Sequence, residues 1–285
     1  MKQYYCAQIT NGNFVNLRKK EILYAGWTGL QEVEIFVNPY FGKILVLDND
    51  IQSAQLDECV YHETFVHSAM IFLEPKNVLI IGGGEGAMVR EVSKYPGIQR
   101  IVMVDLDREL VNLCQEFLPE WSCGSFLDPR LEIKFEDVRV FSRQSDEVFD
   151  LIFMDCPSPA SDDHPLAELY SLHLFDSLKK LLAPGGVFIT QSHSLLKPVC
   201  DVYGKLREIY ANVYRVCCYV PSFFDLWSFT IASDERVLPP FEDCRKRLQS
   251  IKMRFHNPHT VYSGFFSPYD WFLGVGSQRC GDFLE

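Results

Sequence analysis

The sequence has no apolar run of about 18 residues, the length that a helix needs to cross a bilayer. Its first residues, MKQYYCAQITNGNFVN, contain no apolar core of the kind that a signal peptide has. We therefore expect a cytoplasmic protein without a membrane partner. With 285 residues, 47% of them hydrophobic, the chain is long enough to form one large domain and a smaller one.

Clustered cysteines and an excess of positive charge are also missing. The ten cysteines are scattered without a C-x-x-C pair, so we expect reduced core residues and neither a metal site nor a disulfide framework. The 27 basic residues are outnumbered by 38 acidic ones, which gives a net charge of -11. This charge argues against sequence-independent binding to nucleic acid, which requires a basic face, and is compatible with a polycationic small molecule.

The first part of the chain has the composition of a small antiparallel β unit. From about residue 24 to residue 57, short β-rich segments alternate with turn residues such as Asn38-Pro39 and Asn49-Asp50. The next segment, ECVYHETFVHSAMIFL, repeats its apolar residues at helical spacing. We expect an N-terminal β domain over residues 1–58 and a larger domain over residues 59–285.

The larger part of the chain alternates between apolar strands and amphipathic helices. The expected strands are NVLIIGG, RIVMVDLD, LEIKFEDV, VFDLIFMD and GVFITQS, with helical segments such as RELVNLCQEFL between them. This order predicts an α/β fold with a Rossmann-like, methyltransferase-type parallel sheet. The later segments VYRVCCYVPS and WSFTIAS are close enough in sequence to form an antiparallel pair at one edge.

A glycine-rich turn follows the first of these strands, in LIIGGGEGAMVREV. Asp105 ends the next strand about twenty residues later, where a carboxylate can accept both ribose hydroxyls. Asp137 follows the third strand and is suited to an adenine amino group. A nicotinamide dehydrogenase is the rival interpretation, but Met88 and Val89 occupy the candidate positions of the third glycine in G-x-G-x-x-G. The pattern therefore indicates an adenosyl-sulfonium ligand.

Several motifs resemble one family. LVLDNDIQSAQLDECVYHE, VLIIGGGEGAMVREV, VDLD, FDLIFMD and GGVFITQ are similar to the polyamine aminopropyltransferases, the spermidine and spermine synthases, over about residues 29–233. Glu85 stands where spermidine synthases usually have Asp, and VPSFFDLWSFTIAS resembles the corresponding segment of thermospermine synthases. The resemblance implies a homodimer that holds no permanent cofactor and uses decarboxylated S-adenosylmethionine as co-substrate.

The resemblance also implies residue roles. Asp155 would bind the attacking amine and take or relay its proton, and Tyr61 would orient the nitrogen; a helix cap and a core tyrosine are the alternative interpretations. The donor would be bound by Gln31, Gln52, His62, Gly82, Gly84, Glu85, Asp105, Asp137 and Val138. The acceptor would be bound by Ser158, Gln191, Phe223, Asp225 and Trp227.

One departure from the family pattern concerns the acceptor. Ser158, in DCPSPASDDHP, replaces a second acid that holds amine charge. Asp162 and Asp163 lie nearby, but Asp225, beside the aromatic face of Trp227, is the better replacement. We therefore expect spermidine to be preferred over putrescine, thermospermine rather than spermine as product, and agmatine as the second acceptor. A spermidine synthase, a methyltransferase that uses intact S-adenosylmethionine and an inactive regulatory homologue remain alternatives.

Overall fold

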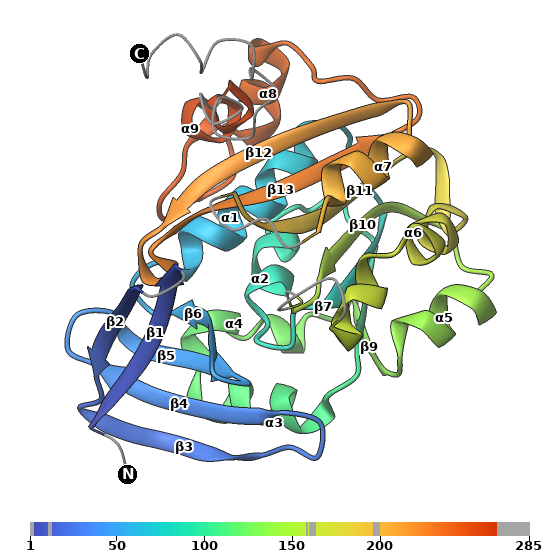
Figure 1. Cartoon of the computed structure of the whole chain (residues 1–285). Coiled ribbons are helices and arrows are strands. Elements are labelled where there is room, and N and C mark those ends of the chain that lie inside the picture. Colours follow the sequence, from blue (N-terminus) through green and yellow to red (C-terminus); the bar gives the residue numbers. More distant parts are fainter. Residues whose placement is uncertain (1–2, 11–12, 158, 160–163, 196–199, 267–285) are drawn as a thin grey trace, which may run out of the picture.

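The computed structural model describes residues 3–10, 13–157, 159, 164–195 and 200–266, and a seven-stranded sheet forms its centre (Figure 1). In spatial order the strands are β12 (Asn212–Val220), β13 (Asp225–Ser233), β11 (Leu182–Ser194), β10 (Phe149–Asp155), β7 (Asn77–Gly82), β8 (Arg100–Asp105) and β9 (Leu131–Phe135). The last five are parallel, as expected for a doubly wound fold. The expected antiparallel pair, β12 and β13, completes one edge.

Both faces of the parallel strands are buried, which explains why their sequences are almost continuously apolar. In β7, Val78 and Ile80 pack in one core cluster, whereas Leu79 and Ile81 pack in another. The first cluster contains residues of α1 (Glu58–Met70), α2 (Ala87–Ser93), α8 (Phe241–Leu248) and α9 (Pro258–Ser263). The second contains residues of α5 (Val138–Gln144), α6 (Leu172–Lys179) and α7 (Val202–Ile209).

The expected small β unit is a four-stranded antiparallel sheet. It consists of β3 (Glu21–Trp27), β4 (Glu32–Asn38), β5 (Gly42–Leu47) and β6 (Asp50–Ala54). One of its faces packs against α3 (Arg108–Phe117) and α4 (Pro119–Ser122) through Val33, Leu45 and Trp121. A hairpin of β1 (Tyr4–Thr10) and β2 (Asn13–Arg18), which the sequence analysis did not predict, packs against the same unit through Tyr5 and Phe36.

Short helices connect the larger elements. They are η1 (Ser125–Leu127), η2 (Pro165–Tyr170), η3 (Pro221–Phe223) and η4 (Gly264–Phe266). The tip of the β12–β13 hairpin, which contains η3, reaches the small β unit (Figure 1). There the Phe224 and Phe41 ring centroids lie 6.0 Å apart. The two sheets, the hairpin tip and α1 therefore meet in one region, which contains the candidate active site.

The remaining expectations concern cysteines, metals and membranes. The cysteines in the described ranges are free thiols; Cys6 and Cys123 are exposed, so the expectation that all cysteines lie in the core was wrong for these two. Within those ranges no cluster of three potential metal ligands is found. In the same part of the chain, no helix is both long enough and apolar enough to cross a membrane.

Candidate active site

The acids chosen from the sequence meet at one edge of the large sheet. Asp105 is the last residue of β8 and Asp155 the last of β10, and both strands neighbour β7. Asp155 lies directly opposite Gly82 in the register. Because parallel strands end at the same edge, their terminal side chains surround the glycine-rich turn, which is the position where α/β sheets bind ligands.

A side chain at either of two glycines in the turn would clash with Asp155 or Asp105. Gly82 has a φ of +77°, and a Cβ at this position would lie 2.2 Å from the Asp155 carbonyl oxygen. A Cβ on Gly84 would lie 2.9 Å from Asp105 Oδ2. The turn therefore passes close to both carboxyl-bearing residues only because it has no side chains there.

Asp155 and Tyr61 form a hydrogen-bonded pair. The Tyr61 hydroxyl donates to Asp155 Oδ1 at 2.6 Å. Burial of the carboxyl raises the pKa of Asp155 to about 6, although His62 and Tyr61 act in the opposite direction. Burial and the Asp155 charge hold the pKa of Tyr61 well above its usual value, so the hydroxyl remains a donor. The pair can accept one proton near neutral pH.

Aromatic rings line one side of this pair. The Tyr61 ring lies 6.0 Å from Phe223 and 6.4 Å from Trp227, and these two rings lie 5.0 Å apart. The Trp227 indole nitrogen is buried and has no hydrogen-bond partner among the described residues. Such a cluster offers π faces to a cation and apolar surface to methylene groups.

His62 bridges two carboxylates. Its Nε2 lies 2.7 Å from Glu85 Oε1 and its Nδ1 lies 3.1 Å from Glu58 Oε2. Burial alone would lower the pKa of His62, but Glu85 and Glu58 raise it to about 10. Glu85 Oε2 also accepts a hydrogen bond from Ser53 at 2.7 Å. The imidazolium therefore fixes Glu85 at the start of α2 while Ser53 holds it from the small β unit.

The loop after β8 joins Asp105 to the small β unit. Burial raises the pKa of Asp105 to about 6, and its Oδ1 accepts the Asp107 N–H at 2.9 Å. Gln31 Nε2 donates to Asp107 Oδ2 at 2.8 Å, which brings this predicted residue to the same loop. Gln52 donates instead to the Asp50 carbonyl oxygen in its own strand.

Asp137 and Val138 lie at the start of α5. The Asp137 side chain caps this helix by accepting the Arg139 N–H at 2.7 Å, and it pairs with the Arg139 guanidinium at 2.6 Å. The Arg139 guanidinium holds the pKa of Asp137 below its usual value. Val138 is buried as the first helical residue.

The predicted acceptor residues have different environments. Gln191 is buried and donates to the Cys156 carbonyl oxygen at 2.8 Å and to the Tyr170 hydroxyl at 2.6 Å, so it supports the chain directly after Asp155. Asp225 is buried at the beginning of β13, where its carboxylate accepts the Leu226 N–H. Ser158, Asp162 and Asp163 lie outside the described residues.

Sequence reasoning missed four contributors to this site. Ser53 and Glu58 hold Glu85 and His62, and Asp107 receives Gln31. Asp57 accepts hydrogen bonds from the N–H and the hydroxyl of Ser222, which ties the hairpin tip to α1. The adjacent acids at 57 and 58 were a visible signal, but the sequence did not show which groups they contact.

Two family models match the chain. Residues 58–241 match the spermine/spermidine synthase domain, and residues 3–55 match the spermidine synthase tetramerisation domain. The second match indicates that the protein belongs to a group that oligomerises. It covers the β1–β2 hairpin and the small β unit.

Relatives match most of the chain. It is 42% identical to polyamine aminopropyltransferase 2 of Pseudomonas aeruginosa over 76% of its own length and 63% of that protein. It is 39% identical to polyamine aminopropyltransferase 1 of Hyperthermus butylicus, in an alignment that covers 91% of this chain and 90% of that protein. It is 32% identical to a thermospermine synthase of Arabidopsis thaliana, in an alignment that covers 80% of this chain and 69% of that protein.

The fold is shared with a solved structure. A spermidine synthase in complex with the transition state analogue AdoDATO superimposes with a TM-score of 0.87 at 24% identity, covering 96% of this chain and 95% of that one. The match to the spermine/spermidine synthase domain covers all seven strands of the large sheet and includes α1, the glycine-rich turn and Asp155. The chain belongs to the spermine/spermidine synthase family of polyamine aminopropyltransferases.

Proposed function

We propose that this protein transfers an aminopropyl group from decarboxylated S-adenosylmethionine to a polyamine, with spermidine as the preferred acceptor, and releases methylthioadenosine. The observation that carries the proposal is the Tyr61–Asp155 pair beside the glycine-rich turn. It places a proton acceptor next to a site suited to a nucleoside, and aromatic rings suited to an alkyl amine adjoin it.

The reaction requires a neutral amine. A primary amine has a pKa of about 10, so its nitrogen must lose a proton before its lone pair can attack. Asp155 takes this proton or relays it to water. The nitrogen then forms a bond to the carbon beside the sulfonium, and the carbon–sulfur bond breaks with its electron pair moving to sulfur. The leaving thioether is neutral and needs no acid.

The donor would lie along the strand ends. In this arrangement Asp105 accepts the ribose hydroxyls, and Asp137 and Val138 meet the adenine. Gly82 and Gly84 provide the close backbone approach. The donor would also meet Gln31, Gln52, His62 and Glu85, and the Glu85 carboxylate would face its positively charged aminopropyl end.

The acceptor would lie against the aromatic cluster. Phe223 and Trp227 would contact the methylene groups and cationic nitrogens of a triamine, with Asp225 at its outer part and Gln191 supporting the site. Ser158 stands where the family has a second acid, so the negative charge that a short diamine needs near its attacking end would be missing. A short diamine gains less from these distant groups, which favours spermidine over putrescine. The likeness of the hairpin tip to thermospermine synthases favours thermospermine as the product.

We also infer the setting in which the enzyme works. We place a homodimer in the cytoplasm, with a β domain over residues 1–58 and a catalytic domain over residues 59–285. The exposed rings of Tyr4 and Phe14 on the β1–β2 hairpin offer an apolar surface for such an assembly. The tetramerisation-domain match over residues 3–55 supports assembly through the N-terminal unit.

The proposal can be tested by incubating the protein with decarboxylated S-adenosylmethionine and equal amounts of putrescine, spermidine and agmatine. The products are then identified by mass. We expect spermidine to be extended fastest. One methylthioadenosine should accumulate for each aminopropyl group transferred. Chromatography then separates thermospermine from spermine. Faster extension of putrescine would reject the acceptor assignment alone, whereas methyl transfer from intact S-adenosylmethionine would reject aminopropyl transfer.

A further inference from the structure

The segment that follows α8 is fastened to α1. The Glu63 carboxylate accepts the backbone N–H groups of Arg254, Phe255 at 3.0 Å and His256 at 2.8 Å. The Thr64 hydroxyl and His256 Nε2 lie 2.8 Å apart. Because Glu63 is fully buried, these bonds fix the backbone of the segment against the helix that carries Tyr61 and His62.

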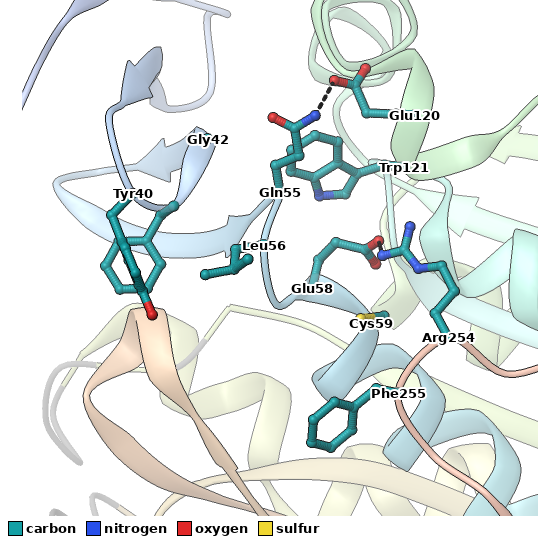
Figure 2. A pocket seen from close by; sticks show the side chains of 11 residues that line it. Tyr40, Gly42, Gln55, Leu56, Glu58, Cys59, Glu120, Trp121, Arg254 and Phe255 are labelled. Carbon is teal, nitrogen blue, oxygen red and sulfur yellow. Dashed lines mark hydrogen bonds and ion pairs between the residues drawn. The ribbon is translucent and has the colours of Figure 1, made fainter.

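This attachment directs one side chain toward the site. Arg254 forms an ion pair with Glu58 at the wall of a cavity of about 610 Å³ that is also lined by Cys59 and Trp121 (Figure 2). The Arg254 side chain is 45% exposed, whereas that of Glu58 is 2% exposed. Arg254 therefore reaches from the cavity to a buried carboxylate.

Glu58 connects Arg254 to His62. Arg254 binds Glu58 Oε1, and Arg90 spans both oxygens at 3.1 and 2.9 Å. His62 Nδ1 lies against Oε2 at 3.1 Å, and its Nε2 lies against Glu85 at 2.7 Å. Three cations thus hold one carboxylate in a single orientation. That carboxylate and the Glu58 carbonyl oxygen, which lies 2.8 Å from His62 Nδ1, together orient the imidazolium that holds Glu85.

We propose that Arg254 is a positioning residue that acts through Glu58 and His62 to orient the Glu85 carboxylate toward the cationic aminopropyl end of the donor. The inference rests on the proposed function, since it assigns a use to the Glu85 charge in donor binding. Arg254 lies outside residues 58–241, which match the spermine/spermidine synthase domain.

The geometry explains why Arg254 adds to what Arg90 already provides. Arg90 contacts both Glu58 oxygens and also binds Glu91 at 2.8 Å. Without Arg254, Glu58 can turn toward Arg90 and away from His62 while its charge stays neutralised. The expected defect is therefore a misplaced Glu85 rather than an unpaired buried charge, and the fold should persist.

Arg254→Gln tests the inference, with Arg254→Lys as the conservative variant and Arg245→Gln as the control. Arg245 also belongs to the C-terminal part and also pairs with a glutamate, Glu242, but lies on the exposed side of α8. Calorimetry should measure the affinities for decarboxylated S-adenosylmethionine and for methylthioadenosine, which lacks both the aminopropyl group and the sulfonium charge.

We expect Arg254→Gln to weaken decarboxylated donor binding about tenfold and methylthioadenosine binding less than about twofold. Arg254→Lys should recover most of the donor affinity, and Arg245→Gln should bind both ligands like the wild type. The KM for the donor should rise by a similar factor with little change in kcat.

An equal loss of affinity for both ligands, or no loss for either, would overturn the inference. Equal losses would mean that Arg254 supports only the fold, which a matching fall in the thermal unfolding temperature would reveal. The wild-type measurement tests the proposed function separately. If the wild type binds intact S-adenosylmethionine as tightly as the decarboxylated form, the proposed function fails whatever the Arg254 variants do.

Discussion

The carboxylates of the site differ in the charges that surround them. Burial would raise the pKa of Glu58, but His62 and Arg90 lower it to about 2. Burial raises the pKa of Asp155 to about 6 because its opposing contacts, His62 and Tyr61, are too weak to offset desolvation. Glu58 therefore remains a fixed negative charge, whereas Asp155 can gain and lose a proton under cellular conditions.

Asp155→Asn should nearly abolish turnover while methylthioadenosine still binds. The amide keeps the shape of the carboxylate but removes the base and the charge that attracts the amine, which predicts a loss of about 10² to 10⁴ in kcat. Steady-state kinetics and calorimetry measure the two quantities. Turnover at the wild-type rate would show that another group accepts the proton.

His62 should make stability depend on pH. Its pKa is about 10 in the folded protein and 6.5 in a free side chain. The stabilisation is thus fully present below pH 6.5 and is lost as pH rises through about 10. Urea unfolding should show the largest difference in unfolding free energy between the wild type and His62→Gln at the low end of this window. We expect a difference of a few kcal/mol there, as the pKa shift implies, and a smaller one toward the upper end.

A constant difference between the two proteins across the window would contradict this assignment. Glu58 and Glu85 are the charged groups in contact with His62, and the charge of Asp155 also interacts with it. Arg245→Gln, whose ion pair is exposed, serves as the control and should follow the pH dependence of the wild type.

At the scale of elements, α1 is the helix through which the parts of the site are joined. Its residues contact β10 through Tyr61, α2 through His67 and the C-terminal segment through Glu63. Asp57, directly before the helix, holds the hairpin tip. All thirteen residues of the helix are buried, so it has no solvent-facing stripe. Its glutamates and histidines are paired with groups outside the helix.

Asp57→Ala should loosen the hairpin tip and weaken acceptor binding. The change leaves the Ser222 N–H and hydroxyl without their acceptor, which costs about 1 to 3 kcal/mol of unfolding free energy. Because Phe223 and Trp227 lie on this hairpin, the KM for spermidine should rise while methylthioadenosine affinity stays unchanged. Urea unfolding and steady-state kinetics measure these effects.

Asp176→Ala is the matched control, since its carboxylate on α6 forms an exposed pair with Lys180, the residue after this helix. This variant should unfold and turn over like the wild type. A KM for spermidine that is unchanged in Asp57→Ala would show that the tip is held in place without Asp57.

At the scale of the whole molecule, the relevant property is the excess of negative charge. The net charge of -11 accompanies a proposed acceptor that carries several positive charges. Long-range attraction between the two accelerates their encounter and is screened as salt increases.

We expect kcat/KM for spermidine to fall about three- to tenfold when ionic strength rises from about 0.02 to about 0.5 M, because the Debye length shrinks over this range. The affinity for methylthioadenosine, which is neutral, should change little. Measurements at saturating donor ensure that the change reflects kcat/KM for spermidine and not donor binding. Equal salt sensitivity of the two ligands would point to a general effect on the enzyme rather than attraction of the amine.

The sequence determined the alternation of strands and helices and the acids at strand ends. Local periodicity predicts an element, and a parallel sheet brings its strand ends to one edge, so Asp105, Asp137 and Asp155 could be chosen in advance. The β1–β2 hairpin was not predicted, although Asn11-Gly12 between two β-rich runs is a typical hairpin signal in the sequence. The helices α8 and α9 were not predicted because they are short and their places depend on packing against other elements.

Only the tertiary structure decided which side chains hold these acids. Ser53 meets Glu85 across 32 residues of sequence, Asp57 meets Ser222 across 165, and Arg254 meets Glu58 across 196. Each contact joins elements whose own patterns contain no information about the partner, since periodicity records which face of an element is buried but not what covers it. The burial that raises the pKa of Asp155 and the ion pairs that lower that of Glu58 arise for the same reason, from the packing of distant segments around α1.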